Sequence, residues 1–281
     1  YGIGTEEATF LEPVGTNYIS FARGTTDGVG HFQTLYSNLS LDANIMNGSR
    51  FDELSEMMDM QNFTDYNIAQ IYFRNTDWPG NNKLYWRYNL SDVDSSRGGP
   101  MPRTQNMKDG RWRWMLFDTD FGFGLNFDYV EGSGTNFGWR NHGGNNAQHN
   151  TVAFALESEN RDNWPNPRSS TYLLRSLLVN NDFRANFANR FADLLNSSFH
   201  PDYVTAHLDS ISAIYRPFMD EHTRRWNEPA SLSVWENEIN RIRSFGQQRE
   251  QAIRNHLNNE LNLGGLRVVT LDVNDQNAGV I

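Results

Sequence analysis

Two short polar loops hold the residues whose types and spacing suggest chemistry. In the first, Asp77 is followed five positions later by Asn82, and the second reads Asp118-Thr-Asp120-Phe-Gly122. Phosphoryl transfer needs a carboxylate that orients the attacking hydroxyl and accepts its proton. It also needs Asn and Asp side chains that hold Mg²⁺ against the phosphates. The two loops therefore predict phosphoryl transfer.

The order of the loops matches the order in protein kinases, where D-x-x-x-x-N precedes D-F-G and a β-hairpin separates them. Asp118 and Asp120 are two residues apart, so on a strand they would share one face. Carboxylates that close repel each other unless a cation or a proton lies between them. Another interpretation is that Asp118 caps the following turn. A calcium-binding EF-hand is excluded, because its sixth and twelfth positions hold Phe123 and Tyr129.

The elements around these loops follow from the apolar spacing. A short helix is predicted from Phe51 to Met58, and a second one, capped by Asp59, continues to Asn75. Strands are predicted at 83–88 and 111–117, the second entered from a turn at Asp109-Gly110. The polar insertion between the strands makes them a hairpin with a long connection.

The remainder divides into irregular and helical parts. Residues 1–50 are predicted to be irregular with one short helix at 32–36, and residues 122–150 to be irregular. From Ser169 the spacing is helical, and a capping box of Ser233 and Glu236 is predicted to open the last helix, which runs to about Leu261. Residues 266–273 are predicted to form a strand, the first of a following β domain.

The predicted fold class is therefore α+β, a kinase-like C-terminal lobe with a short β-hairpin plus a mainly helical subdomain. Residues 1–50 are expected to be an irregular lead-in left from an N-terminal lobe, and residues 51–166 the catalytic core. Residues 167–263 are expected to form the helical subdomain, and residues 264–281 a linker with the strand.

Composition narrows the function classes. The net charge of −10 repels phosphate backbones, which argues against nucleic acid as a partner. No run approaches eighteen apolar residues, so no membrane span is predicted. The chain has no cysteine, which excludes disulfides and thiolate metal sites.

The two loops and their surroundings resemble the CotH kinase family, the spore-coat protein H relatives. The similar stretches include Met60–Tyr66, Ile68–Tyr72, Asp77–Asn82 and Gly110–Trp114 leading into Asp120, and the resemblance covers about residues 51–262. It implies that Asp77 is the catalytic Asp and that Asn82 and Asp120 bind the ATP–Mg²⁺ cofactor. Asn82, Asp118 and Asp120 are the implied metal ligands. Family members are typically exported, which implies a secreted or cell-surface protein.

The sequence departs from the kinase pattern before Asp77. Kinases place a Gly-rich loop and a Lys there to hold phosphates. Only Arg23, Arg50 and Arg74 are basic in this stretch, since the two lysines are Lys83 and Lys108. Most of the nucleotide-binding N-terminal lobe is therefore expected to be missing from these 281 residues, which are expected to bind ATP poorly and to transfer no phosphate alone.

The expected function is ATP- and Mg²⁺-dependent phosphoryl transfer to Ser/Thr hydroxyls of a protein at the cell surface or in a coat or matrix. The alternative is a non-catalytic adhesion or matrix-binding protein on a kinase-like scaffold. A glycan-active enzyme with paired carboxylates is a third class, but no pattern selects a pair.

Several other residues allow two interpretations. His142 and His149 could ligate a metal, although an incidental place in a polar loop is favoured, and solvated Arg140 is favoured over a phosphate-binding one. Trp112 and Trp114 could be core or a stacking platform, and Trp78 is expected to pack the loop.

Overall fold

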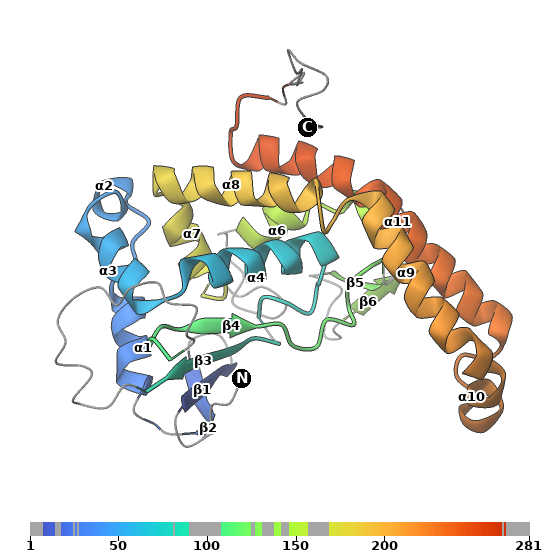
Figure 1. Cartoon of the computed structure of the whole chain (residues 1–281). Coiled ribbons are helices and arrows are strands. Elements are labelled where there is room, and N and C mark those ends of the chain that lie inside the picture. Colours follow the sequence, from blue (N-terminus) through green and yellow to red (C-terminus); the bar gives the residue numbers. More distant parts are fainter. Residues whose placement is uncertain are drawn as a thin grey trace, which may run out of the picture.

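The computed structural model describes residues 8–14, 18–24, 26, 28–80, 82–89, 108–124, 127–130, 138–141, 146–156, 169–265 and 267. Figure 1 shows a small sheet, a layered helical body above it, and a pair of long helices that project to one side. The strands are β1 (Ala8–Val14), β2 (Tyr18–Gly24), β3 (Leu84–Tyr88), β4 (Arg113–Met115), β5 (Phe127–Val130) and β6 (Gly138–Asn141). The helices are α1 (Gly28–Ser37), α2 (Ala43–Met46), α3 (Ser49–Met57), α4 (Met60–Phe73), η2 (Asn146–Gln148), α6 (Thr151–Leu156), α7 (Tyr172–Leu178), α8 (Asn181–Leu195), α9 (Pro201–Tyr215), η3 (Arg216–Phe218), α10 (Met219–Trp226) and α11 (Leu232–Glu260).

Helix α4 is the centre of the body. Its N-cap is Asp59, as predicted, whose side chain accepts a hydrogen bond from the backbone N–H of Asn62. Burial extends around the helix and takes in polar residues such as Asn67 and Gln70 as well as apolar ones. A helix buried on several sides must lie between layers. Figure 1 shows α4 between the sheet and α8.

The sheet has the strand order β2-β1-β3-β4, and every neighbouring pair is antiparallel. The predicted hairpin of 83–88 and 111–117 is confirmed as β3 and β4, with Tyr85 opposite Trp114. Leu11 of β1 pairs with Tyr85 from the other side. The mixed architecture, rich in helix and with an antiparallel sheet, agrees with the predicted α+β class.

The expectation of irregular chain in residues 1–50 is wrong at 8–24, where β1 and β2 form an antiparallel pair. The reason is that β1 gains a partner from β3, whose paired residues lie 74 to 80 positions later, and no local pattern reveals such pairing. The short helix expected at 32–36 is present and longer, as α1. Residues 122–150 also contain more structure than expected, because β5 pairs with β6.

The predicted helices after Ser169 are present, with one boundary corrected. Ser231, and not Ser233, is the N-cap of α11, and its hydroxyl accepts from the N–H of Val234. The expected strand at 266–273 lies outside the described residues apart from Arg267, which is in no strand. The division of the chain into domains stays a prediction.

Candidate functional site

The loop that carries Asp77 begins where α4 ends. Arg74 caps the helix in the left-handed conformation, with φ of 58°, and its N–H bonds to the carbonyls of Gln70 and Ile71. The buried Asn75 follows, and its side-chain oxygen accepts the N–H of Asp77 at 3.1 Å. The Asn75 amide also donates to Gln70 Oε1 at 2.9 Å and, at 3.5 Å, to the carbonyl of Asp118. One buried side chain thus connects the two loops predicted to do chemistry.

Asp77 and Asn82 lie together. The side-chain nitrogen of Asn82 donates to Asp77 Oδ2 at 2.7 Å. That bond uses the amide nitrogen of Asn82, so the carbonyl oxygen is the atom of this side chain that could ligate a metal. Trp78, between them in sequence, is 1% exposed and packs the loop as predicted.

Asp118 and Asp120 also come together, but not on a strand. Strand β4 ends at Met115, so the expectation that the two residues share a strand face is wrong. Asp118 instead has φ of 48°, and the turn after it is closed by the N–H of Gly122 bonding to the Thr119 carbonyl at 3.1 Å. A left-handed residue reverses the chain within a few positions, and this reversal brings the two carboxylates close.

The electrostatics place three carboxylates near one another. The pKa of Asp118 is raised, chiefly by the negative charge of Asp120, then by desolvation, a hydrogen bond with Asp120, and the charge of Asp77. Since both Asp118 and Asp120 are exposed, repulsion between like charges is the main cause of the shift. A cation that bound there would relieve this repulsion.

The Asp120-Phe121-Gly122 segment packs against the end of α4. The N–H of Phe123 bonds to the Phe73 carbonyl at 2.8 Å. A Cβ atom on Gly122 would lie 3.1 Å from the Phe73 and Thr119 carbonyl oxygens, closer than ordinary contact. Glycine is therefore favoured at this position by the close approach of two backbones, which holds Asp120 near the Asp77 loop.

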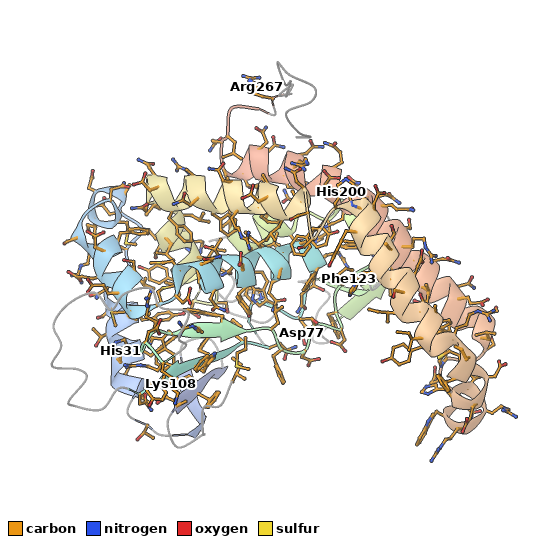
Figure 2. The ribbon with its side chains drawn as sticks, in the orientation of Figure 1. His31, Asp77, Lys108, Phe123, His200 and Arg267 are labelled. Atoms are coloured by element: carbon orange, nitrogen blue, oxygen red, sulfur yellow. The ribbon has the colours of Figure 1, made fainter. Side chains whose placement is uncertain are left out.

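Backbone strain is concentrated at this site. Among the described residues, six other than glycine have positive φ, and four of these lie in or beside the two loops, which Figure 2 marks at Asp77 and Phe123: Arg74, Asn82, Asp118 and Phe123. The left-handed conformation costs an L-residue roughly 1–2 kcal/mol. Such residues persist where the surrounding structure holds them, and they cluster at functional sites.

The donor set fits Mg²⁺. This ion favours oxygen ligands and binds through one or two carboxylates, with waters or substrate phosphates completing an octahedron. Asp118, Asp120 and the Asn82 amide oxygen offer such a set. Among the described residues, no three His, Cys, Asp or Glu side chains are close enough to hold an ion without further ligands. The set therefore suits a metal that arrives with phosphate oxygens. Convergence of the Asn82 and Asp120 oxygens on one ion stays a prediction.

The other candidates have different roles. Trp112 and Trp114 are 0% and 5% exposed, so they belong to the core and form no stacking platform. His149 contacts Thr151 through Nδ1 at 2.9 Å. His142 lies outside the described residues, as does the side chain of Arg140.

Of the three basic residues that precede Asp77, the structure describes the side chains of two. Arg74 is fully buried, and burial lowers its pKa to about 10. Arg50 is exposed and contacts Asn38 and Glu53 on and beside α3. The side chain of Arg23 lies outside the described residues. Neither of these contacts brings Arg50 to the carboxylates of the site.

Arg249, on α11, supports the site and was not predicted. Its side chain is 0% exposed, and burial lowers its pKa to about 9. It donates to the carbonyls of Ile71 and Tyr72, in the last turn of α4, at 2.9 and 3.0 Å. It also donates to the carbonyls of Ala147 and His149 and to Thr151 Oγ1. The only signal in the sequence is an Arg on the apolar face of α11, four residues after Phe245 and four before Ile253.

Comparison with known proteins gives one finding. A family model described as CotH kinase protein matches residues 22–253, which includes both loops. A search of curated proteins finds no match. None of the described helices combines the length and apolarity that crossing a bilayer demands.

Proposed function

Because the chain belongs to the CotH kinase protein family, we propose that it transfers the γ-phosphoryl group of ATP to Ser/Thr hydroxyls of an exported protein. The observation that carries this proposal is the meeting of the two loops. Asn82 bonds to Asp77, and the charges of Asp120 and Asp77 both raise the pKa of Asp118. Structure that serves folding alone rarely gathers exposed like charges.

Asp77 is proposed as the residue that orients the acceptor hydroxyl and takes its proton. The Asn82 bond to Oδ2 and the Asn75 bond to the Asp77 N–H hold the carboxylate in place. A carboxylate positioned by two neighbours needs little reorganisation when the hydroxyl arrives.

Asn82, Asp118 and Asp120 are proposed as the side chains that hold Mg²⁺. When bound, the ion supplies positive charge that bridges the phosphates and spreads the charge of the transition state. The protein contributes the fixed geometry: Gly122 and Phe123 fasten Asp120 to the end of α4, and Asn75 fastens the Asp118 backbone there too.

The partner and location follow from the family alone. We propose a protein substrate at the cell surface or in a coat or matrix, and a secreted or surface-bound enzyme. The weak ATP binding expected of residues 1–281 alone also stays a prediction. A kinase assay should therefore use the full-length gene product beside this chain.

The deciding experiment replaces Asp77 by Asn in the full-length protein and measures radiolabel transfer from ATP to a protein substrate. The change is isosteric, and loss of a positioned general base costs about 10²–10⁴-fold in rate. Asp220→Asn makes the same change at an exposed position in α10 and should leave the rate unaltered. Transfer by the Asp77 variant at near wild-type rate would remove this residue from catalysis.

A second candidate function is adhesion without catalysis. The observation that favours it is the set of large apolar side chains at the far end of the projecting helices, where Ile214, Phe218 and Trp226 are more than 60% exposed. Exposed apolar groups in one region mark interaction surfaces. Absence of nucleotide transfer by the full-length wild type, with Mg²⁺ and Mn²⁺ both tried, would favour this function.

A further inference from the structure

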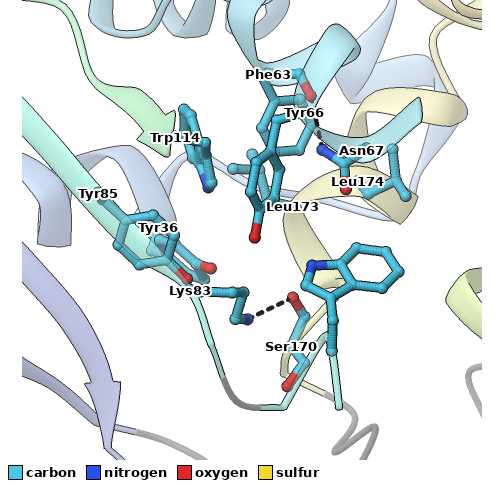
Figure 3. Close-up of a pocket in the computed structure, with 11 residues that line it drawn as sticks. Tyr36, Phe63, Tyr66, Asn67, Lys83, Tyr85, Trp114, Ser170, Leu173 and Leu174 are labelled. Carbon is cyan, nitrogen blue, oxygen red and sulfur yellow. Dashed lines mark hydrogen bonds between the residues drawn. The ribbon is translucent and has the colours of Figure 1, made fainter. Parts of the chain in front are cut away.

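A small, partly enclosed space lies next to the candidate site, on the inner side of β3. It offers about 20 Å³, where one buried water needs roughly 10–15 Å³. Its walls come from α1, α4, β3, β4, the start of α7 and the Asp77 loop (Figure 3). The lining residues are Tyr36, Phe63, Tyr66, Asn67, Trp78, Lys83, Tyr85, Trp114, Ser170, Leu173 and Leu174.

Lys83 places its amino group in this space. The side chain is buried, with the residue 5% exposed, and Nζ donates to the Ser170 carbonyl at 3.0 Å. Burial lowers the pKa of Lys83 to about 7, and an anion beside the amino group would favour its charged form, which has three N–H donors. Among the described residues, Ser170 is the one acceptor found for it, so further donors face the space.

Three tyrosine hydroxyls point to the same place. Figure 3 shows the hydroxyls of Tyr36, Tyr66 and Tyr85 directed toward the region of the Lys83 amino group. Burial raises the pKa of each phenol, and for Tyr85 the nearness of the other two raises it further. The phenols therefore remain protonated and can donate.

The indole of Trp78 adds another donor. Its Nε1 is buried and meets no acceptor in hydrogen-bonding geometry, although it is near enough to lower the pKa of Tyr66. Tyr66 already accepts from Gln70 Nε2 at 3.4 Å, so its own hydrogen is left to donate. A buried donor without an acceptor costs about 1–3 kcal/mol.

The walls are thus rich in donors and hold no carboxylate among the described residues. A buried cation is ordinarily paired. We propose that this cavity binds a single monatomic anion, chloride in ordinary buffers, between Lys83, the tyrosine hydroxyls and the Trp78 indole. The anion accepts several hydrogen bonds at once and neutralises Lys83.

The most direct test is diffraction from crystals of residues 1–281 grown in sodium bromide. We expect an anomalous peak in the cavity within hydrogen-bond distance of Lys83 Nζ. Bromide stands in for chloride because both are spherical acceptors of similar size. A cavity that holds only water at 200 mM bromide would overturn the proposal.

A solution test compares chloride with gluconate, which is too large for the cavity, at equal ionic strength. Raising chloride from about 10 to about 200 mM should raise the Tm of the wild type by roughly 2–4 °C if the site binds in the tens of millimolar. Lys83→Met should abolish that rise. Lys108→Met, at the only other lysine and on the Tyr88 ring face, should keep it.

An equal chloride effect in wild type and the Lys83 variant would contradict the proposal. If the Lys83 variant does not fold, bromide diffraction from the wild type still decides. Neither readout depends on phosphoryl transfer, so the anion site and the proposed kinase activity succeed or fail separately.

Discussion

Helix α11 belongs to two regions that are built differently. Its buried residues begin at Phe245 and continue through Arg249 to Leu257, where the helix lies in the body. None of its residues before Phe245 is buried, and neither is any residue of α9 beside it. We call the part made of α9, η3, α10 and α11 up to Ser244 the arm. Figure 1 shows the arm projecting beyond the sheet and the helical layers.

The contrast shows what each region can do. In the body, single side chains such as Asn75 and Arg249 bond to several backbone groups and hold the loops of the candidate site. In the arm, ion pairs such as Arg216 with Glu236 are exposed, and pairs of that kind are worth about 0–1 kcal/mol. Precise positioning is therefore possible in the body, whereas the arm offers exposed surface.

The sharpest comparison uses two arginines on α11. Arg249→Met should lower the free energy of unfolding by about 3–5 kcal/mol, because buried acceptors on α4, η2 and α6 lose their donor. Arg243→Met, in the arm, removes an exposed contact with Asp209 and should cost under about 1 kcal/mol. Urea unfolding of both variants measures the difference. Equal effects would mean that the arm and the body are stabilised alike.

Arg249 also marks a limit of sequence reasoning. Its role depends on acceptors about 100 and 177 residues away, and periodicity shows only that an Arg lies on an apolar face. The β1–β3 pairing was missed for the same reason. Both are long-range contacts, which local patterns do not report.

Features that depend on local sequence patterns were predicted more accurately than these long-range contacts. The Asp59 cap and the extent of α4 follow from one polar residue and helical spacing, and the β3–β4 hairpin follows from its turn and alternation. The kinase-like spacing identified Asp77, Asn82, Asp118 and Asp120 as a group, and the bond between Asn82 and Asp77 agrees with that grouping. The way Asp118 meets Asp120 was not predictable, because a left-handed Asp118 replaces the expected strand.

A second comparison uses two glycines. Gly122→Ala should destabilise the protein by about 1–3 kcal/mol, because its Cβ would lie 3.1 Å from two backbone oxygens that cannot move freely. Gly30→Ala, in α1, meets no atom within 4 Å and should stabilise by about 0.5–1 kcal/mol through helix propensity. Thermal unfolding of both variants measures the two changes in stability, which we expect to have opposite signs. A neutral Gly122 variant would show that Asp120 is not held as closely as the contacts indicate.

A pH titration tests a partly buried contact of the body. Burial, and then the charge of Arg87, lowers the pKa of His31 to about 4, and His31 Nδ1 accepts from Trp112 Nε1 at 3.0 Å. The unfolded chain binds the proton more tightly, near pH 6.5, so stability is complete above pH 6.5 and falls as the pH decreases toward 4. Since the group is partly exposed, we expect a loss of roughly 1–2 kcal/mol.

His31→Gln is the control for that titration, because it keeps an acceptor for Trp112 and cannot titrate. Its stability should vary less between pH 6.5 and 4 than that of the wild type, by the same roughly 1–2 kcal/mol. Parallel curves for the two proteins would assign the acid loss to other groups.

The smallest effect is expected at the tip of the arm. Trp226 is 61% exposed and packs chiefly against its neighbour Arg225, whose guanidinium lies 5.1 Å from the ring centre. Trp226→Ala should therefore change the free energy of unfolding by no more than about 0.5 kcal/mol. The same substitution at Trp112, which is 0% exposed and packed edge-on against Phe32 at 4.8 Å, should cost about 3–5 kcal/mol. Chemical denaturation of both variants checks the pair. A large cost at Trp226 would instead make the arm part of the folded core and remove the main support for the adhesion alternative.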